Sequence, residues 1–174
     1  MVSGYTEWYT NPPAPVTSAF GRLTGNRTYL LDIGEEILTA YYYDDCENVV
    51  QSRSTNHLGG YDSDFFAYTF SGKLKKHYHI HTVPDKLSQT ELYTYEYDHS
   101  DRLVSVSHSV NGCSPVYLMQ HNYDEFCRLS GTLFHNGRIM VEYTYNVRDW
   151  MTRISSTEFN QTLHYTDGSW HSPI

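Results

Sequence analysis

Cysteine, charge and long apolar runs are all scarce in this chain of 174 residues. The three cysteines, Cys46, Cys113 and Cys127, form no Cys-x-x-Cys pair, and an odd number does not indicate a disulfide framework. We expect Cys46 and Cys127 to be exposed thiols. No apolar run approaches the ~18 residues of a transmembrane helix, and the N-terminal region lacks the basic start and apolar core of a signal peptide. The sequence therefore predicts no membrane span and shows no export signal.

Positive charge is also scarce, since the formal net charge is -8 and the pI is near 5.6. Binding to nucleic acid without sequence preference needs a basic surface, so nucleic acid is not an expected partner. The nucleophile elbow Gly-x-Ser-x-Gly and the phosphate-binding loop Gly-x-x-x-x-Gly-Lys-Ser/Thr are both absent. We expect no enzymatic activity and no cofactor.

Tyrosine, in contrast, is abundant, with 17 residues. Tyrosine suits strands and half-buried surfaces, and no segment keeps a helical apolar period over ten residues. The sequence therefore predicts an all-β chain of antiparallel hairpins. The expected strands are 28–32, 37–43, 49–53, 65–70, 74–81, 92–97, 103–110, 116–123, 129–134, 139–145, 151–155 and 162–165. Residues 55–62 are expected to form a long loop.

The expected hairpins repeat one another. The segment Tyr93 to Leu103 alternates tyrosines with polar residues, and then Asp98 opens a turn, as Asp side chains commonly do. Similar segments begin at Tyr43, Tyr123 and Tyr145, and a shortened one begins at Phe70. The repeated turn motif consists of Tyr43, Asp44, Tyr97, Asp98, Arg102, Tyr123, Asp124, Arg128, Tyr145 and Asn146. Such a repeat governs the fold, because one unit cannot bury its own face.

The pattern Tyr-Asp-x-x-x-Arg-Leu, preceded by Tyr-x-Tyr, resembles the YD repeat of bacterial Rhs proteins and their animal relatives, the teneurins. The usual motif has glycine before Arg-Leu, where this chain has Glu47, Asp101, Cys127 and Asp149; the short unit keeps Gly72. Gly21-Arg22-Leu23 and Tyr42-Tyr43-Asp44 are similar to the lead-in region of Rhs-type proteins. The resemblance covers roughly residues 20 to 167.

The resemblance implies hairpins that spiral into a hollow shell around a C-terminal effector, often a toxin, in competition between bacteria or at the cell surface. With so few units we expect an open, curved sheet. Residues 1–19, which contain several prolines, are expected to be a leader or linker, 20–167 the repeat domain and 168–174 a tail. Family members often carry Asp-Pro motifs in a self-cleaving core, and this chain has none.

We therefore expect a non-enzymatic scaffold and a fragment of an Rhs-like shell. Its partners would be the rest of a larger polypeptide or its effector, and its free strand edges would favour self-association. The family resemblance also implies a secreted or cell-surface location.

A run of alternating histidines, His77, His79 and His81, is the sharpest candidate for chemistry. On a strand the three share one face, and two imidazoles at i and i+2 can bind one zinc ion. Possible further ligands are His99, His108, His121 and Glu91. The alternative is that histidine replaces tyrosine as a planar, half-buried packing residue, which the absence of Cys, Asp or Glu at ligand spacing beside the run favours.

A second alternative is a carbohydrate- or surface-binding module. Trp150, Tyr78 and Tyr117 are the candidates for stacking on a sugar ring, because amphipathic rings with one edge in water serve as binding platforms. Simple packing between neighbouring strands would account for the same residues.

Overall fold

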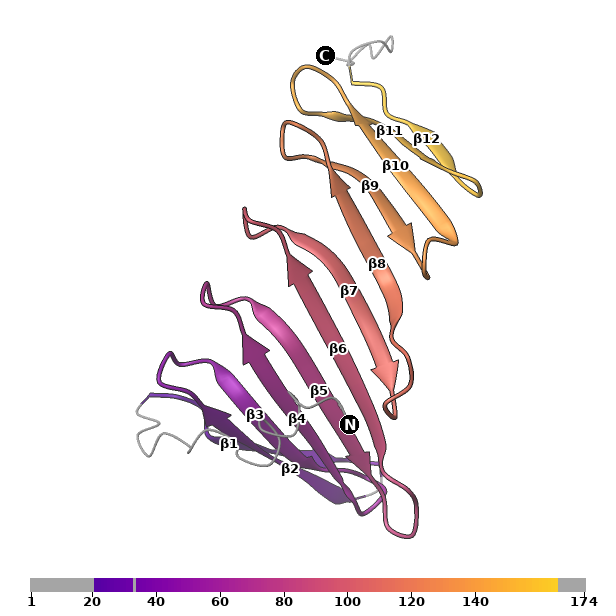
Figure 1. The fold of residues 1–174 in the computed structure, drawn as a ribbon. Coiled ribbons are helices and arrows are strands. Elements are labelled where there is room, and N and C mark those ends of the chain that lie inside the picture. Colours follow the sequence, from indigo (N-terminus) through magenta and orange to yellow (C-terminus); the bar gives the residue numbers. More distant parts are fainter. Residues whose placement is uncertain (1–20, 33, 166–174) are drawn as a thin grey trace, which may run out of the picture. The chain divides into compact units, whose positions relative to one another are not determined.

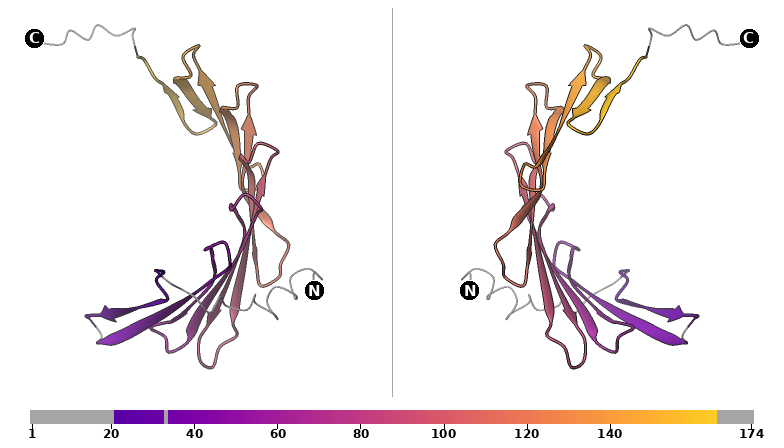
Figure 2. Two further views of the ribbon diagram at one scale, coloured as in Figure 1. Left: turned by 90° about the vertical axis from the view of Figure 1, so that its left-hand side faces the viewer. Right: turned by 90° about the vertical axis from the view of Figure 1, so that its right-hand side faces the viewer.

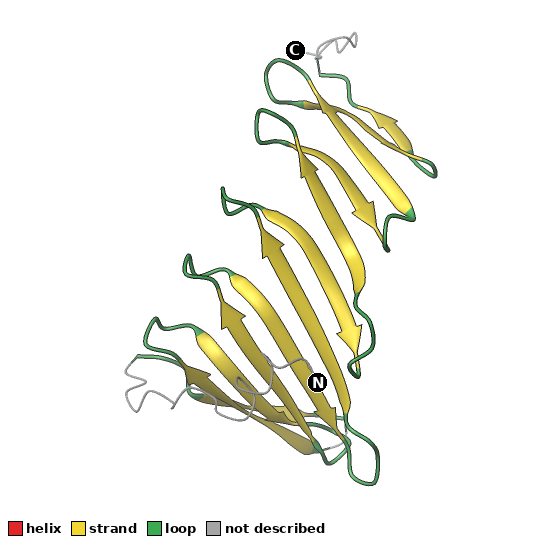
Figure 3. Cartoon of the chain, in the orientation of Figure 1, coloured by secondary structure: helices red, strands yellow, loops and turns green. Residues whose placement is uncertain are grey.

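The computed structural model describes residues 21–32 and 34–165, which form strands and turns without a helix (Figure 1, Figure 3). The expected leader, 1–19, and tail, 168–174, lie outside the described residues. The strands are β1 (Gly25–Leu30), β2 (Glu35–Tyr43), β3 (Val49–Thr55), β4 (Tyr61–Tyr68), β5 (Leu74–Thr82), β6 (Gln89–Tyr97), β7 (Leu103–Val110), β8 (Val116–Tyr123), β9 (Leu129–Phe134), β10 (Ile139–Tyr145), β11 (Met151–Ser156) and β12 (Asn160–Thr162). Within these ranges we find no helix of the length and apolarity that a membrane span needs.

The chain divides into two units. Unit 1 comprises the described residues up to Tyr95 together with His108–Pro115, and it holds β1 to β5 and most of β6. Unit 2 comprises Glu96–Ser107 and the described residues from Val116 onward, and it holds most of β7 and β8 to β12.

Strand order follows chain order, and the pairings are antiparallel. In unit 1, β1 to β6 pair consecutively, and in unit 2, β8 to β12 do the same. The strands of unit 1 fan out when seen from the side, which is the normal twist of a sheet (Figure 2). Among the described residues, β1 pairs only with β2 and β12 only with β11, so the sheet is open. The predicted all-β fold of repetitive antiparallel hairpins is confirmed.

Little of the chain is deeply buried. Among the described residues, the buried hydrophobic side chains are Val50 on β3 and Val106 on β7, and the buried polar ones are Ser105 and Thr132. Most other strand residues are half-buried. Stability therefore rests on the hydrogen bonds between strands, on the turns and on cross-strand side-chain pairs. Each such side-chain pair contributes roughly 0.2–1 kcal/mol.

The turns that follow β2, β6, β8 and β10 share one construction. In each, a side-chain oxygen accepts backbone N–H groups two and four residues later. Asp98 Oδ1, for example, accepts from Ser100 and Arg102 at 2.8 and 2.9 Å. The acceptors are Asp44, Asp98, Asp124 and Asn146. These are the polar residues of the expected turn motif, and the structure places each at the same point of its hairpin.

The residue before the final Arg or its equivalent has a positive φ in every one of these turns. The values are 71° for Glu47, 61° for Asp101, 65° for Cys127 and 61° for Asp149, and Gly72 in the turn after β4 has 80°. Glycine adopts this region without steric cost, which explains why the usual motif has glycine there. Four of the turns in this chain keep the conformation without the glycine.

Five tyrosines, four of them at the end of a strand, bond to a backbone carbonyl earlier in the chain. The Tyr123 O–H donates to the carbonyl of Leu103 at 2.7 Å, and the Arg102 guanidinium lies 4.3 Å from the centre of the Tyr123 ring. The same hydroxyl-to-carbonyl bond joins Tyr43 to Leu23, Tyr68 to Val49, Tyr145 to Leu129 and Tyr165 to Met151. We call these contacts the tyrosine locks.

The locks correct two sequence-based expectations. The anchor of the shortened unit is Tyr68, not Phe70, because Tyr68 makes the lock while Phe70 is fully exposed. The motif also begins earlier than expected, since Gly21 has a φ of 79°, Arg22 lies over the Tyr43 ring and Leu23 accepts its lock. Gly21-Arg22-Leu23 therefore matches the last three positions of the turn motif in φ, in the arginine over the ring and in the lock.

The expected long loop at 55–62 is wrong, because β4 begins at Tyr61 and ends at Tyr68 rather than covering 65–70. A short turn joins β3 to β4. The Asn56 side-chain oxygen closes it by accepting hydrogen bonds from the backbone N–H groups of Leu58 and Gly60 at 3.1 and 2.9 Å, and Gly59 has a φ of 77°. A tight turn thus replaces the loop and leaves residues 61–64 free to join β4. The cysteines, as expected for Cys46 and Cys127, are free and exposed, and so is Cys113.

Candidate metal centre

The alternating histidines of β5 face acidic residues on β4. The antiparallel register places Asp62 opposite His81, Asp64 opposite His79 and Phe66 opposite His77. Alternate residues of a strand share one face, so these side chains form two adjoining rows on the same face of unit 1. Carboxylates and imidazoles therefore lie next to each other on neighbouring strands.

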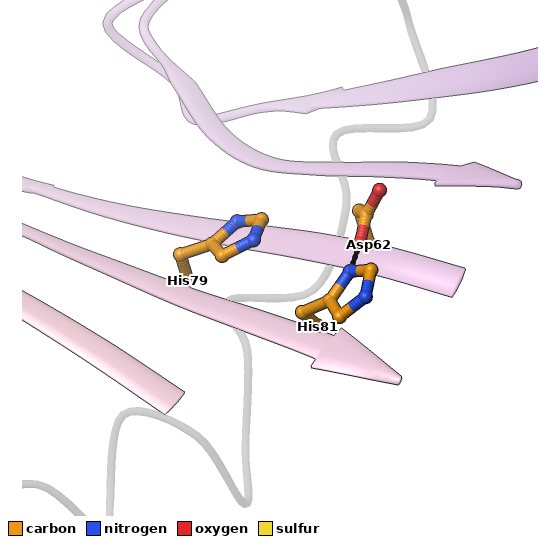
Figure 4. A group of neighbouring side chains, drawn as sticks. All are labelled: Asp62, His79 and His81. Atoms are coloured by element: carbon orange, nitrogen blue, oxygen red, sulfur yellow. Dashed lines mark hydrogen bonds and ion pairs between the residues drawn. The ribbon is translucent and has the colours of Figure 1, made fainter. Parts of the chain in front are cut away.

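Short contacts join the two rows. Asp64 Oδ1 lies 2.8 Å from His77 Nε2 and 2.8 Å from His79 Nδ1, while Asp62 Oδ1 lies 2.5 Å from His81 Nδ1. Figure 4 shows Asp62 reaching across to His81, with His79 further along the same strand. The side chains of Asp64, His77 and His79 are 24–27% exposed, so the group is shielded but open to small solutes.

Neighbouring groups keep Asp64 ionised and in place. Burial raises the pKa of Asp64, but hydrogen bonds from His77 and His79 outweigh it and hold the pKa below its usual range. The second carboxylate oxygen accepts a hydrogen bond from Ser52 Oγ on β3 at 3.2 Å. A charged carboxylate with one oxygen held by a neighbour is well suited to present the other oxygen to a cation.

Aromatic rings fix the orientation of His77. Phe66 stacks on it with ring centres 4.7 Å apart, and Tyr93 of β6 stacks on it at 5.7 Å. Tyr93 stacks in turn on His108 at 4.3 Å and donates its O–H to Glu91 at 3.1 Å. Glu91 lies 3.4 Å from His108 Nε2. The imidazole of His77 is therefore held by rings from strands on both sides of β5.

Two overlapping groups of donors result, and His79 belongs to both. One consists of Asp64, His77 and His79, and the other of Asp62, His79 and His81, with donor atoms within 4.8 Å of one another in each. Two imidazoles and one carboxylate form a donor set used by zinc and by other first-row transition metals. The same contacts also satisfy the polar groups of a packed sheet, which is the alternative.

Sequence reasoning found the histidines but missed Asp62 and Asp64. The missed signal was the alternation Asp62-Ser63-Asp64, which repeats the spacing of the histidines. Asp62 was placed at the end of the expected loop, and Asp64 was left outside the strand expected from Phe65. Of the further ligands considered, Glu91 and His108 lie in unit 1 and pair with each other. His121 lies in unit 2, 3.0 Å from Thr132 Oγ1, and burial lowers its pKa; His99 is exposed.

The sugar-stacking candidates lie on different elements. Trp150, just before β11, lines an open groove of about 510 Å³ with Tyr165, Arg148 and Thr162 among its other walls. The Trp150 and Tyr165 ring centres are 5.0 Å apart. Tyr117 is exposed on β8, and Tyr78 on β5 packs against Phe65 at 6.5 Å. The groove thus contains Trp150 but neither Tyr78 nor Tyr117, the other two candidates for stacking on a sugar.

Comparisons with known proteins add little. No protein-family model matches the chain, and no curated protein matches it. Among solved structures 19 chains match. One is a chain of the structure titled "Crystal Structure of TcdB2-TccC3-Cdc42", with a TM-score of 0.35 and 14% sequence identity over 69% of this chain. The match spans 7% of the length of that chain.

Proposed function

We propose that this chain is a non-enzymatic scaffold, a segment of an Rhs-like repeat sheet that encases or presents an effector. The supporting observation is the recurrence of one interlocking unit: a turn, a tyrosine lock and an arginine over the locked ring. The guanidinium-to-ring distances are 4.3 Å for Arg102 and Tyr123, and 4.8 Å for Arg128 and Tyr145. Each hairpin is held by its neighbours rather than by a core of its own, so the sheet is built to be extended.

Among the described residues, the outer edges of β1 and β12 have no strand partner, which supports the same proposal. The Leu163 N–H donates to the Thr152 carbonyl, and the Ser156 N–H donates to the Phe159 carbonyl. Because such bonds alternate along an antiparallel pair, the N–H groups of Asn160 and Thr162 point away from β11. On β1, the bond from the Tyr41 N–H to the Thr24 carbonyl places the Arg27 and Tyr29 N–H groups on the outer side by the same rule. Outward rows of this kind are templates for another strand.

Absolute mass in solution tests this proposal. Light scattering over a concentration series should give a mass that rises above 20.3 kDa as the protein is concentrated, since open edges seek partners. A mass that stays at the monomer value over the whole series would contradict the proposal and favour a self-contained module.

The groove at Trp150 favours a second candidate function, glycan binding. A titration with a panel of glycans, followed by tryptophan fluorescence, should show a saturable change that Trp150→Phe removes and that Tyr117→Phe, which alters a ring outside the groove, keeps. Absence of a saturable change across the panel would count against this function. For both candidate functions we also propose a bacterial origin and a secreted or cell-surface location. Both rest on the family resemblance.

A further inference from the structure

We propose that Asp64, His77 and His79 form a binding site for a divalent transition metal, for which zinc is the best fit. The site lies within unit 1 and is separate from the scaffold function, which needs no metal. The proposal rests on the convergence of three donor atoms from two strands, two of them imidazole nitrogens and one a carboxylate oxygen.

The geometry needs only a small adjustment to hold zinc. Tetrahedral zinc with ligands at about 2.0–2.1 Å places neighbouring donor atoms about 3.3 Å apart. The nitrogens of His77 and His79 are each 2.8 Å from Asp64 Oδ1. An opening of about half an ångström would make room for an ion among three donor atoms that already lie within 4.8 Å of one another. Each ring nitrogen would bind the metal in its deprotonated form, and the proton of its hydrogen bond to Asp64 would pass to solvent or to the other ring nitrogen. The partial exposure of the three side chains leaves a fourth position for water.

The surroundings favour this group over the neighbouring one. Asp64 contacts two histidines, has its second oxygen held by Ser52 and lies beside a His77 ring that is stacked on both sides. Asp62 contacts His81, whose side chain is 35% exposed near the end of β5. Metal sites depend on groups that orient their ligands, and these groups are richer around Asp64.

Nitrogen donors also decide the class of metal. Calcium and magnesium prefer all-oxygen ligand sets, whereas two imidazoles suit zinc, copper, nickel or iron. Because Asp64 lies on β4 and the histidines on β5, a bound ion would join the two strands of one hairpin. Binding to the folded state alone would then raise its stability in proportion to the logarithm of the metal concentration.

The test uses the full chain produced without a polyhistidine tag. Calorimetric titration with zinc should show one equivalent bound, and cobalt should give the visible absorption of a tetrahedral ion. His79→Gln and Asp64→Asn should each weaken zinc binding at least 100-fold. His121→Gln, which alters a histidine of unit 2, is the matched control and should change the affinity by less than threefold.

His77→Gln and His81→Gln distinguish the two donor groups. The proposal predicts that His77→Gln removes tight binding and that His81→Gln leaves it within threefold; the reverse result would overturn the assignment. Less than a tenth of an equivalent of bound zinc in the wild-type chain would also overturn it. Should a variant fail to fold, zinc-induced NMR shifts of the imidazoles in the wild-type chain decide: they should centre on His77 and His79, and shifts centred elsewhere would refute the site.

Discussion

Single residues in this chain hold conformations that their side chains disfavour. Cys127 and Glu47 occupy the left-handed region where the repeat pattern usually has glycine. A residue with a Cβ atom is destabilised there by roughly 1–2 kcal/mol. Asp101 and Asp149 share the conformation, but Asp tolerates it better because its short side chain bonds locally. The disfavoured backbone is thus most costly at Cys127 and Glu47.

Cys127→Gly should therefore stabilise the chain. The gain from relieving the left-handed backbone, about 1–2 kcal/mol, exceeds the roughly 0.5–1 kcal/mol lost to the greater freedom of glycine in the unfolded state. We expect a net increase of about 0.5–1 kcal/mol in the free energy of unfolding, measured by urea denaturation. Cys127→Ser, which keeps the Cβ atom, is the control and should show no such gain. Equal stability of the two variants would contradict the role assigned to this position.

Asp98 should titrate well below its usual range. The hydrogen bond from the Arg102 backbone N–H is the largest cause, and together with the Arg102 side chain and the Ser100 N–H it outweighs desolvation and lowers the pKa of Asp98 from 3.8 to about 2. Because the pKa of the folded state is depressed, this stabilisation is present above pH 4 and is lost as the pH falls toward 2. NMR titration of the Asp98 carboxyl carbon should give a midpoint near 2. A midpoint near 3.8 in the folded chain would show that the turn bonds do not hold the carboxylate.

At the scale of elements, the tyrosine locks are the recurrent contact between hairpins. Tyr123→Phe removes only the hydroxyl that donates to Leu103 and leaves that carbonyl without its donor. We expect a loss of about 1 kcal/mol in the free energy of unfolding. Tyr117→Phe, on the exposed part of β8, is the control and should change stability little. Equal effects of the two substitutions would mean that the lock contributes nothing.

Most strands were predictable, because each follows an alternating run bounded by a turn residue. Asn111-Gly112 and Asn136-Gly137 have positive φ at both positions, and they lie in the loops at 111–115 and 135–138, which are longer than a two-residue hairpin turn. The start of β4 was predicted wrongly for a local reason. Thr55 to Asp62 contains two glycines and several polar residues, which favour a loop, but the Asn56 side chain closes the chain into a short turn.

Because the start of β4 was predicted to be a loop, the sequence did not reveal the acidic half of the candidate metal centre. Composition alone does not show that β4 begins at Tyr61, and only the register on β5 brings Asp64 beside His79. The histidine run was visible in the sequence because its members are separated by one residue. The acidic partners of the histidines are 13 to 19 residues away in the chain. Their pairing requires β4 to begin at Tyr61, where the sequence pattern predicted a loop through Asp62.

In the molecule as a whole, the described strands form a sheet that is open at both ends. Within each unit the strands pair in chain order, and among the described residues nothing pairs with the outer sides of β1 and β12. Adding further repeat units or a partner strand stabilises an open antiparallel sheet of repeated units. This is the property that separates a scaffold segment from a self-contained binding module.

The most direct measurement of this claim compares two variants of the β12 edge by light scattering. Thr162→Pro removes an outward N–H group and obstructs strand addition, while Thr162→Val keeps that group and the branched shape of the side chain. We predict that the Thr162→Val chain gains mass with concentration as the wild-type chain does, and that the Thr162→Pro chain gains clearly less. The same gain in both variants would contradict association through this edge, and no gain in either variant or in the wild-type chain would contradict the scaffold itself.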